Sequence, residues 1–335
     1  MKNLLPGKCT KSRSHLSGSV HVLLIGVVVS AALSTAFAQP INGGEARNQE
    51  MWRQAIAQRE VPAQGCFHAS YPSLEWTKVD CRVAPNIPFL PRTGPQGHRT
   101  VGNGNDYAAE VTSGLISKTI GSFTKVKGVT TETGSLGAND YSLQINSNLM
   151  NTAICDGARN PVKCQAWEQF VYSSGYETAF MQYWLIAWNK ACPIGWGGYK
   201  NDCFTNSAAV AVPQVDITQL ETLKLSASAQ NGGIDTLLLT AGTEAYATTA
   251  SDSVVDLATG WTESEFNIFG DGGSSEAEFN SGSSLTVKVA VSNGTRNAPT
   301  CVSGAGTTAE TNNLTLGSCA SMDGARPFIK FVESN

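Results

Sequence analysis

The sequence predicts an all-β protein, an antiparallel β-sandwich or jelly roll closed by disulfides. Three observations support this. The chain has 335 residues, 41% of them hydrophobic and 15% charged, which supplies a sizeable core and excludes a disordered protein or a coiled coil. Its 33 glycines and many Ser, Thr and Asn residues favour short strands joined by turns. Short stretches of alternating polar and apolar residues recur from residue 139 onward.

The first 38 residues have the pattern of a secretory signal peptide. Four basic residues between Lys2 and Arg13 precede an apolar run over 20–33, which ends in the small-residue pattern Ala-Phe-Ala at 36–38. The run is shorter than the roughly 20 residues that a spanning helix needs, which argues against the alternative of a membrane anchor. We therefore expect cleavage before Gln39 and a secreted protein, extracellular or periplasmic, with no membrane contact.

The charge of the mature chain bears on its partners. Removal of the signal segment takes away four of the 23 basic residues and none of the 27 acidic ones, which leaves a net charge of −8. A nucleic acid or an anionic membrane would require a basic patch. We expect neither as a partner, and we expect a monomer.

The cysteines predict a disulfide framework. Cys9 leaves with the signal segment, and an even number of cysteines in an exported chain points to four disulfides. These cysteines form four close pairs separated by long cysteine-free stretches, so pairing in sequence order is the simplest connectivity. A metal site is not expected, because the chain has no C-x-x-C pair and no His cluster. The expected pairs are Cys66 with Cys81, Cys155 with Cys164, Cys192 with Cys203, and Cys301 with Cys319.

Histidine limits the chemistry further. Of the four histidines, two lie in the signal segment, and His68 and His98 lie in the N-terminal part of the mature chain. From residue 141 to the C-terminus there is none, so that region cannot by itself form a Ser-His-Asp, Cys-His or His-based zinc site. Catalysis there has to use carboxylates, amides or hydroxyls, and we expect no cofactor.

Residues 39–138 differ from the rest of the chain. A short polar helical stretch is expected over 45–60, followed by the Pro-rich segment "NIPFLPRTGPQGHRT" at 86–100, which regular elements do not cross easily. Strands are possible at 107–111 and 121–129. We expect residues 39–138 to be a leader, a linker or a pro-segment, part of which packs on the main domain, and residues 139–335 to be the sandwich domain.

Ten strands are expected in that domain. Glycine turns, such as the Asn-Gly-Gly at 231–233, separate the alternating runs, whereas a βαβ protein would need amphipathic helices between them. The expected strands lie within 140–146, 164–173, 177–188, 220–228, 234–242, 244–249, 261–270, 275–280, 284–291 and 326–334.

Several of these strands place amides or carboxylates and tryptophan on one face, because side chains alternate with a period of two. Tryptophans between polar residues are costly to leave in water and suit a groove that holds an extended polymer, either a polypeptide or a polysaccharide. The alternative is that the polar residues simply face solvent on an outer layer. The residues expected on this wet surface as substrate-binding groups are Gln144, Trp167, Gln182, Trp184, Trp261, Glu263 and Asn267.

Two runs resemble glutamic peptidases of the eqolisin type. The run "CQAWEQFVY" at 164–172 resembles the strand with the catalytic glutamine, and Gln169 stands at the matching place. The run "SEFNIFGDG" at 264–272 resembles the strand with the catalytic glutamate, which points to Glu265, although Ser-Glu-Phe stands where the family has Ala-Glu-Trp. The resemblance consists of short pieces over roughly residues 139–295.

This resemblance implies a concanavalin-like β-sandwich that needs no metal, is preceded by a pro-segment, and acts as a secreted acid endopeptidase. Glu265 would act as general base and then as general acid, and the amide of Gln169 would stabilise the oxyanion. Two other carboxylates remain alternatives. Glu168 adjoins Gln169 and fits the neprosin-like peptidases, which use two glutamates, but it points to the opposite face. Glu278 is a second candidate, and its simpler reading is an exposed strand carboxylate.

Carbohydrate chemistry on the same architecture is the other hypothesis. Glu263 and Glu265 lie at i and i+2 on one face, a spacing that permits the two carboxyls of a glycosidase without being diagnostic of one. A polysaccharide-binding module would need only tryptophans as stacking platforms. The sequence leaves a polysaccharide-hydrolysing or polysaccharide-binding sandwich open as the alternative to a peptidase.

Overall fold

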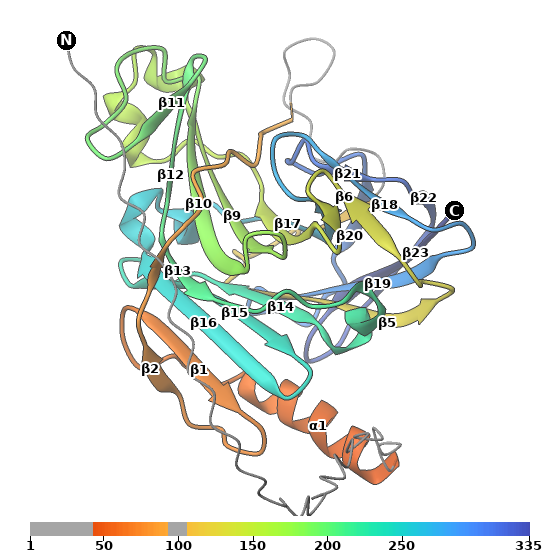
Figure 1. The fold of residues 1–335 in the computed structure, drawn as a ribbon. Coiled ribbons are helices and arrows are strands. Elements are labelled where there is room, and N and C mark those ends of the chain that lie inside the picture. Colours follow the sequence, from red (N-terminus) through yellow and green to blue (C-terminus); the bar gives the residue numbers. More distant parts are fainter. Residues whose placement is uncertain (1–42, 93–105) are drawn as a thin grey trace, which may run out of the picture. The chain divides into compact units, whose positions relative to one another are not determined.

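Two large antiparallel sheets pack face to face in the computed structural model, which describes residues 43–92 and 106–335 (Figure 1). These residues belong to one compact unit, Asn42–Asn335. The expected signal segment and His98 lie outside the described residues. The prediction of an all-β antiparallel sandwich is confirmed.

The first sheet has nine strands, and all of its neighbours are antiparallel. In spatial order they are β2 (Thr77–Val79), β1 (Cys66–Ser70), β16 (Glu244–Ser251), β15 (Ile234–Ala241), β14 (Lys224–Ser228), β5 (Lys118–Lys127), β19 (Ser284–Ser292), β23 (Phe328–Ser334) and β22 (Thr315–Met322).

The second sheet has ten strands and carries the polar face. Its main path runs β11 (Gly197–Tyr199), β12 (Asp202–Asn206), β10 (Thr178–Ile186), β9 (Gln165–Ser173), β8 (Tyr141–Ser147), β17 (Glu263–Gly270), β4 (Tyr107–Glu110) and β20 (Thr300–Ser303). Beside this path, β13 (Ala208–Ala211) pairs with β10 and with β3 (Arg82–Val83).

Smaller elements complete the fold. A short sheet contains β21 (Thr311–Asn312), β18 (Glu276–Phe279), β6 (Glu132–Gly134) and β7 (Gly137–Ala138). Five 3-10 turns are η1 (Ala153–Gly157), η2 (Pro161–Lys163), η3 (Ile217–Thr222), η4 (Asp252–Val254) and η5 (Leu257–Thr259). Helix α1 (Gly43–Ile56) overlaps the range 45–60 expected to be helical but begins two residues earlier and ends four residues earlier, and it packs through Trp52 and Ile56 against Ala69 and Ala245.

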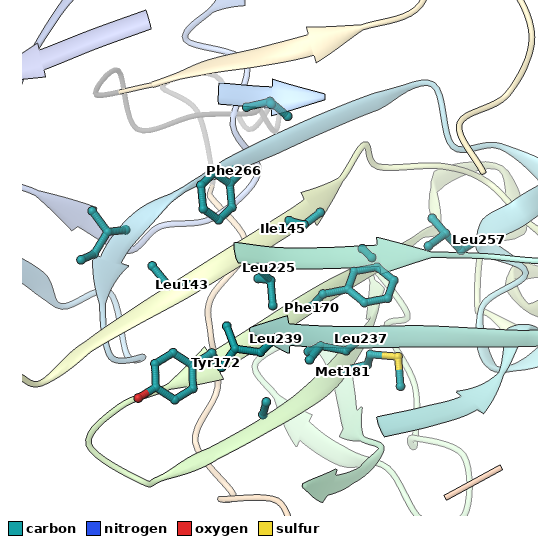
Figure 2. Close-up of a cluster of buried hydrophobic side chains, with 14 of the residues drawn as sticks. Leu143, Ile145, Phe170, Tyr172, Met181, Leu225, Leu237, Leu239, Leu257 and Phe266 are labelled. Carbon is teal, nitrogen blue, oxygen red and sulfur yellow. The ribbon is translucent and has the colours of Figure 1, made fainter. Parts of the chain in front are cut away.

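The main core lies between the two sheets, where the apolar positions of each alternating strand meet. The buried side chains come from both layers, as Figure 2 shows. Strand β5 lies between β14 and β19, so part of the range 39–138 is built into this sandwich. Whether residues 39–138 are removed stays a prediction. The labelled core residues are Leu143, Ile145, Phe170, Tyr172, Met181, Leu225, Leu237, Leu239, Leu257 and Phe266.

One glycine lets the sheets approach closely. The ring of Phe266 lies over Gly121 of β5, and a Cβ at that position would fall 2.1 Å from a ring carbon. We therefore expect Gly121→Ala to lower the free energy of unfolding by about 1–3 kcal/mol, the usual range for overpacking a core. Urea unfolding measures this. Gly198→Ala is the matched control, because its Cβ would meet no described atom closer than 3.7 Å; equal losses in both variants would contradict the packing described here.

Four disulfides join the cysteines in the expected order, with Cα separations from 5.3 to 6.3 Å. The Cys301–Cys319 bond connects β20 to β22 and so links the two large sheets. Within residues 43–92 and 106–335, no helix combines the length and the apolar character needed to cross a membrane.

Candidate functional site

A row of four polar side chains crosses four adjacent strands of the ten-stranded sheet. Gln182 of β10 lies opposite Gln169 of β9, and Gln169 lies opposite Asn146 of β8. Asn146 in turn lies opposite Glu265 of β17. The next residues along these strands, such as Phe266, point into the core, so the row occupies the other face of the sheet.

Gln169 and Glu265 therefore share one face, two strands apart, with Asn146 between them. Nε2 of Gln169 donates to Oδ1 of Asn146 at 3.2 Å, and Nδ2 of Asn146 donates to Oε2 of Glu265 at 2.9 Å. Strand spacing puts the two outer backbones about 10 Å apart. The amide of Asn146 thus connects the two predicted catalytic side chains.

The prediction of an exposed, wet face is wrong, because all four side chains of the row are fully buried. Two segments cover them. The first, which we call the strap, is residues 85–92 and runs across the sheet (orange in Figure 1). The second, the cover loop, is residues 304–310; the backbone N–H of Thr307 donates to Oε2 of Glu265 at 2.9 Å.

Asp106, which was not among the predicted site residues, interacts with Glu265. The two carboxyl groups interact, since each shifts the pKa of the other, and neither oxygen of Asp106 has a hydrogen-bond donor among the described residues. Two carboxyls in such proximity can hydrogen-bond to each other when one of them carries a proton, so we infer that the pair shares one proton and one negative charge. No signal in the sequence identifies Asp106, because it follows a Gly- and Asn-rich stretch and belongs to no alternating run.

Burial controls the protonation of this pair. Burial raises the pKa of Asp106 to about 6, with a further rise from the charge of Glu333 and a drop from Arg92 of the strap. The pKa of Glu265 lies well above its usual range because of burial first and the neighbouring Asp106 charge second. Glu263, half-buried on the same strand, has its pKa raised to about 7 by burial and by nearby carboxylates. Glu265 is therefore the partner that holds the shared proton.

The amide network should contribute to stability as well as to chemistry. Asn146 donates to Gln144 and Glu265 and accepts from Gln169. We expect Asn146→Ala to destabilise the protein by about 1–3 kcal/mol for each buried partner left unpaired, measured by urea unfolding. Asn201→Ala, at an exposed turn between β11 and β12, is the control and should change stability little. A loss in Asn146→Ala no larger than in the control would contradict the network.

The strap is held by groups that bind a polypeptide backbone. Oε1 of Gln182 accepts from the backbone N–H of Phe89 at 2.7 Å, while its Nε2 donates to the carbonyl of Ile87 at 2.9 Å. Asn206 donates to the carbonyl of Pro85 at 2.9 Å. The backbone N–H of Gly273 donates to the carbonyl of Pro88 at 2.9 Å.

The cover loop is hydrogen-bonded to the C-terminal end of the strap. Oε1 of Glu310 accepts from the N–H of Leu90 at 3.0 Å, and the N–H of Ala309 donates to the Leu90 carbonyl at 2.8 Å. The N–H of Arg92 donates to the carbonyl of Thr307 at 2.9 Å. An extended chain thus lies across the polar face, bound mainly through its main chain.

The remaining predicted residues divide into two groups. Gln144, Trp167, Gln182, Trp184 and Asn267 belong to the buried polar face or its aromatic cluster: Asn267 lies opposite Gln144 and donates to Glu333 at 2.9 Å. Trp167 and Trp184 lie 6.5 Å apart, and Leu90 of the strap packs on their cluster.

The other predicted residues lie elsewhere. Trp261 does not join the polar face: β17 begins at Glu263, so the alternation does not reach it, and its ring stacks on Phe170 in the main core. Glu168 points between the sheets, where the charge of Asp235 of β15 raises the pKa of its carboxyl beyond the effect of burial. Glu278 is exposed on β18. Neither alternative carboxylate is therefore close to Gln169 on the polar face.

Several buried acceptors at the site have no partner among the described residues, and one of them belongs to Gln169. Oε1 of Gln169 has no hydrogen-bond donor among the described residues. Because buried polar atoms are nearly always satisfied, this oxygen is suited to a donor from water or from a bound molecule. Within residues 43–92 and 106–335, no group of three or more His, Cys, Asp or Glu side chains is placed to hold a metal ion.

Comparisons with family models, with curated proteins and with solved structures found no match. The functional proposal rests on the geometry of the Glu265–Asp106 pair and the amide row.

Proposed function

We propose that the protein is a secreted peptide hydrolase of the glutamic-peptidase type, with a concanavalin-like sandwich. In this proposal the Glu265–Asp106 pair moves the protons and Gln169 stabilises the oxyanion. The observation that carries it is a buried pair of interacting carboxyls, connected by Asn146 to Gln169 beneath an extended polypeptide. The eqolisin-like residues of the sequence are the ones that meet on this face.

The pair suits the addition of water across a peptide bond. Its carboxylate takes a proton from water, the water oxygen bonds to the carbonyl carbon, and the carbonyl oxygen becomes an oxyanion held by the N–H groups of Gln169. The pair then gives a proton to the amide nitrogen, and the C–N bond breaks. The products are a carboxylic acid and an amine, and the pair again holds one proton.

The protonation state sets the pH range of such a reaction. Below about pH 6, Asp106 takes up a proton and the pair loses its base. We therefore expect kcat/KM to fall on the acid side of about pH 6 rather than to rise throughout the acid range. This differs from the acid endopeptidase that the family resemblance implies, because burial raises both pKa values and the Asp106 charge raises that of Glu265 further.

Polypeptide fits this face better than polysaccharide. The side-chain amide of Gln182 both accepts from and donates to one stretch of main chain, a pairing that any extended peptide offers. The tryptophans that would stack on sugars are covered by Leu90.

Several features support a secreted, regulated enzyme. The signal-like segment and four disulfides both favour an oxidising compartment outside the cytoplasm. In the described structure the backbone N–H of Thr307 is hydrogen-bonded to the carboxyl group of Glu265. The cover loop therefore has to move before a substrate can reach the pair. The expectation that the N-terminal region acts as a pro-segment is part of this proposal.

The substrate class is tested by incubating the purified chain with casein and with β-glucans from pH 3 to pH 9. We expect new peptides from casein, seen by mass spectrometry, and no release of sugar from the glucans. Sugar release, or retention on glucan without cleavage of either polymer, would instead support the polysaccharide alternative and contradict the peptidase.

A further inference from the structure

The side chain of Phe89 occupies an apolar pocket beside the polar row. Phe89 is fully buried among Ala84, Val171, Phe180 and Ala209. Its ring meets that of Phe180 edge-on, with centroids 6.0 Å apart. The pocket is formed by strands of the sheet that also carries Gln169 and Gln182, so it adjoins the candidate site.

The strap is bound differently from an ordinary strand. Prolines at 85, 88 and 91 remove the N–H groups that a sheet ladder would use. Side chains of Gln182, Asn206 and Glu310 bind its main chain instead. These contacts do not depend on the identity of the strap residues, whereas the pocket around Phe89 does.

A glycine turn completes this cradle. Gly272 has a φ of +85°, and a Cβ there would lie 2.7 Å from Cγ2 of Ile87 and 3.6 Å from Cζ of Phe89. The absence of a side chain at Gly272 lets the strap approach the turn between β17 and β18. The neighbouring N–H of Gly273 binds the carbonyl of Pro88 at 2.9 Å.

We propose that the strap lies where a polypeptide substrate lies, and that the pocket around Phe89 is a subsite selecting a large apolar side chain of that substrate. This inference rests on the proposed function. The side chains of Gln182, Asn206 and Glu310 would bind the main chain of any extended peptide. The pocket would discriminate between peptides by the size and polarity of one side chain. Burial of a whole aromatic side chain instead of a methyl group favours binding about ten- to hundredfold.

The test uses the full chain with Phe89→Ala, which empties the pocket, and two capped peptides of the strap sequence. One is Asn-Ile-Pro-Phe-Leu-Pro, and the other has Ala in place of Phe. Calorimetry should show the Phe peptide binding at least ten times tighter than the Ala peptide. In the double variant Phe89→Ala/Ala209→Leu, a leucine side chain fills the pocket from the sheet, and the difference between the peptides should disappear.

A second measurement keeps the test independent of the stability of Phe89→Ala. Products of the wild-type chain from a random peptide library should show Phe, Leu or Met enriched at one fixed position relative to the cleaved bond. Equal binding of both peptides, no binding of either to the folded variant, or cleavage without enrichment would overturn the subsite. Cleavage without enrichment leaves the peptidase standing, whereas peptide discrimination without any cleavage leaves the subsite standing and contradicts the peptidase.

Discussion

The protein is expected to be markedly more stable at pH 4 than at pH 8. Burial raises the pKa of Glu333 from its ordinary value of 4.5 to about 8 and that of Asp235 from 3.8 to about 8. A raised carboxyl pKa contributes stability that is fully present below the pKa of the unfolded chain and is lost as pH rises through the folded pKa. For Glu333 this loss amounts to about 4 kcal/mol between pH 4.5 and pH 8.

Asp235 acts at a different place, between the sheets. After burial, the charge of Asp252 contributes most to the raised pKa of its carboxyl, and Glu168 interacts with it as well. The pKa of Glu168 is raised well above its usual range by burial first and by Asp235 second. Deprotonation of both partners would place like charges between β9 and β15, so alkaline pH should loosen the sandwich itself.

Thermal unfolding at each pH between 4 and 9 measures this effect. The glutamine in Glu333→Gln stays neutral throughout, so the stability of this variant should fall less steeply with pH than that of the wild type. The two slopes should differ by up to about 1.4 kcal/mol per pH unit. Glu278→Gln, which changes an exposed carboxylate, should follow the wild type. Stability that is constant or rises from pH 4 to pH 8 would contradict the raised pKa values of these buried carboxyls.

The strands and the disulfides were predictable because their signals are local. Period-two alternation identifies strands such as β8, β9 and β19, and the four cysteine pairs are each close in sequence. Short strands such as β3, β7 and β21 have only two residues, too few to show a period. Their existence depends on partners far away in the chain.

The site was predictable only in part. Alternation places Gln169 on one face of β9 and Glu265 on one face of β17, but the pairing of both strands with β8 is long-range information. The sequence also contains no sign that residues 85–92 and 304–310 cover this face. Because the covering contacts are mostly to main chain, they leave little trace in the residue types.

The second large effect concerns Glu265. A residue that transfers protons typically contributes 10²- to 10⁴-fold to the rate, so we expect Glu265→Gln to lower kcat/KM for peptide hydrolysis by at least about 10³-fold. A glutamine keeps the shape and still accepts hydrogen bonds from Asn146 and Thr307, but it cannot share a proton with Asp106. The folded state should therefore survive this substitution.

Gln169 should matter less than Glu265 but in the same direction. Loss of one oxyanion donor typically costs about 10²- to 10³-fold in kcat, which is the effect expected for Gln169→Ala. Gln169→Glu keeps the volume and removes the N–H donors, so it should be at least as impaired. Activity unchanged in both variants would exclude an oxyanion role for this side chain.

The most direct measurement compares peptide hydrolysis by the wild type, Glu265→Gln and Glu278→Gln on casein at pH 6–7, with melting temperatures recorded for each. Our account predicts that Glu278→Gln cleaves like the wild type, while Glu265→Gln is folded and inactive. Hydrolysis by folded Glu265→Gln at the wild-type rate would contradict the account, as would a wild-type chain that cleaves no peptide bond at any pH tested.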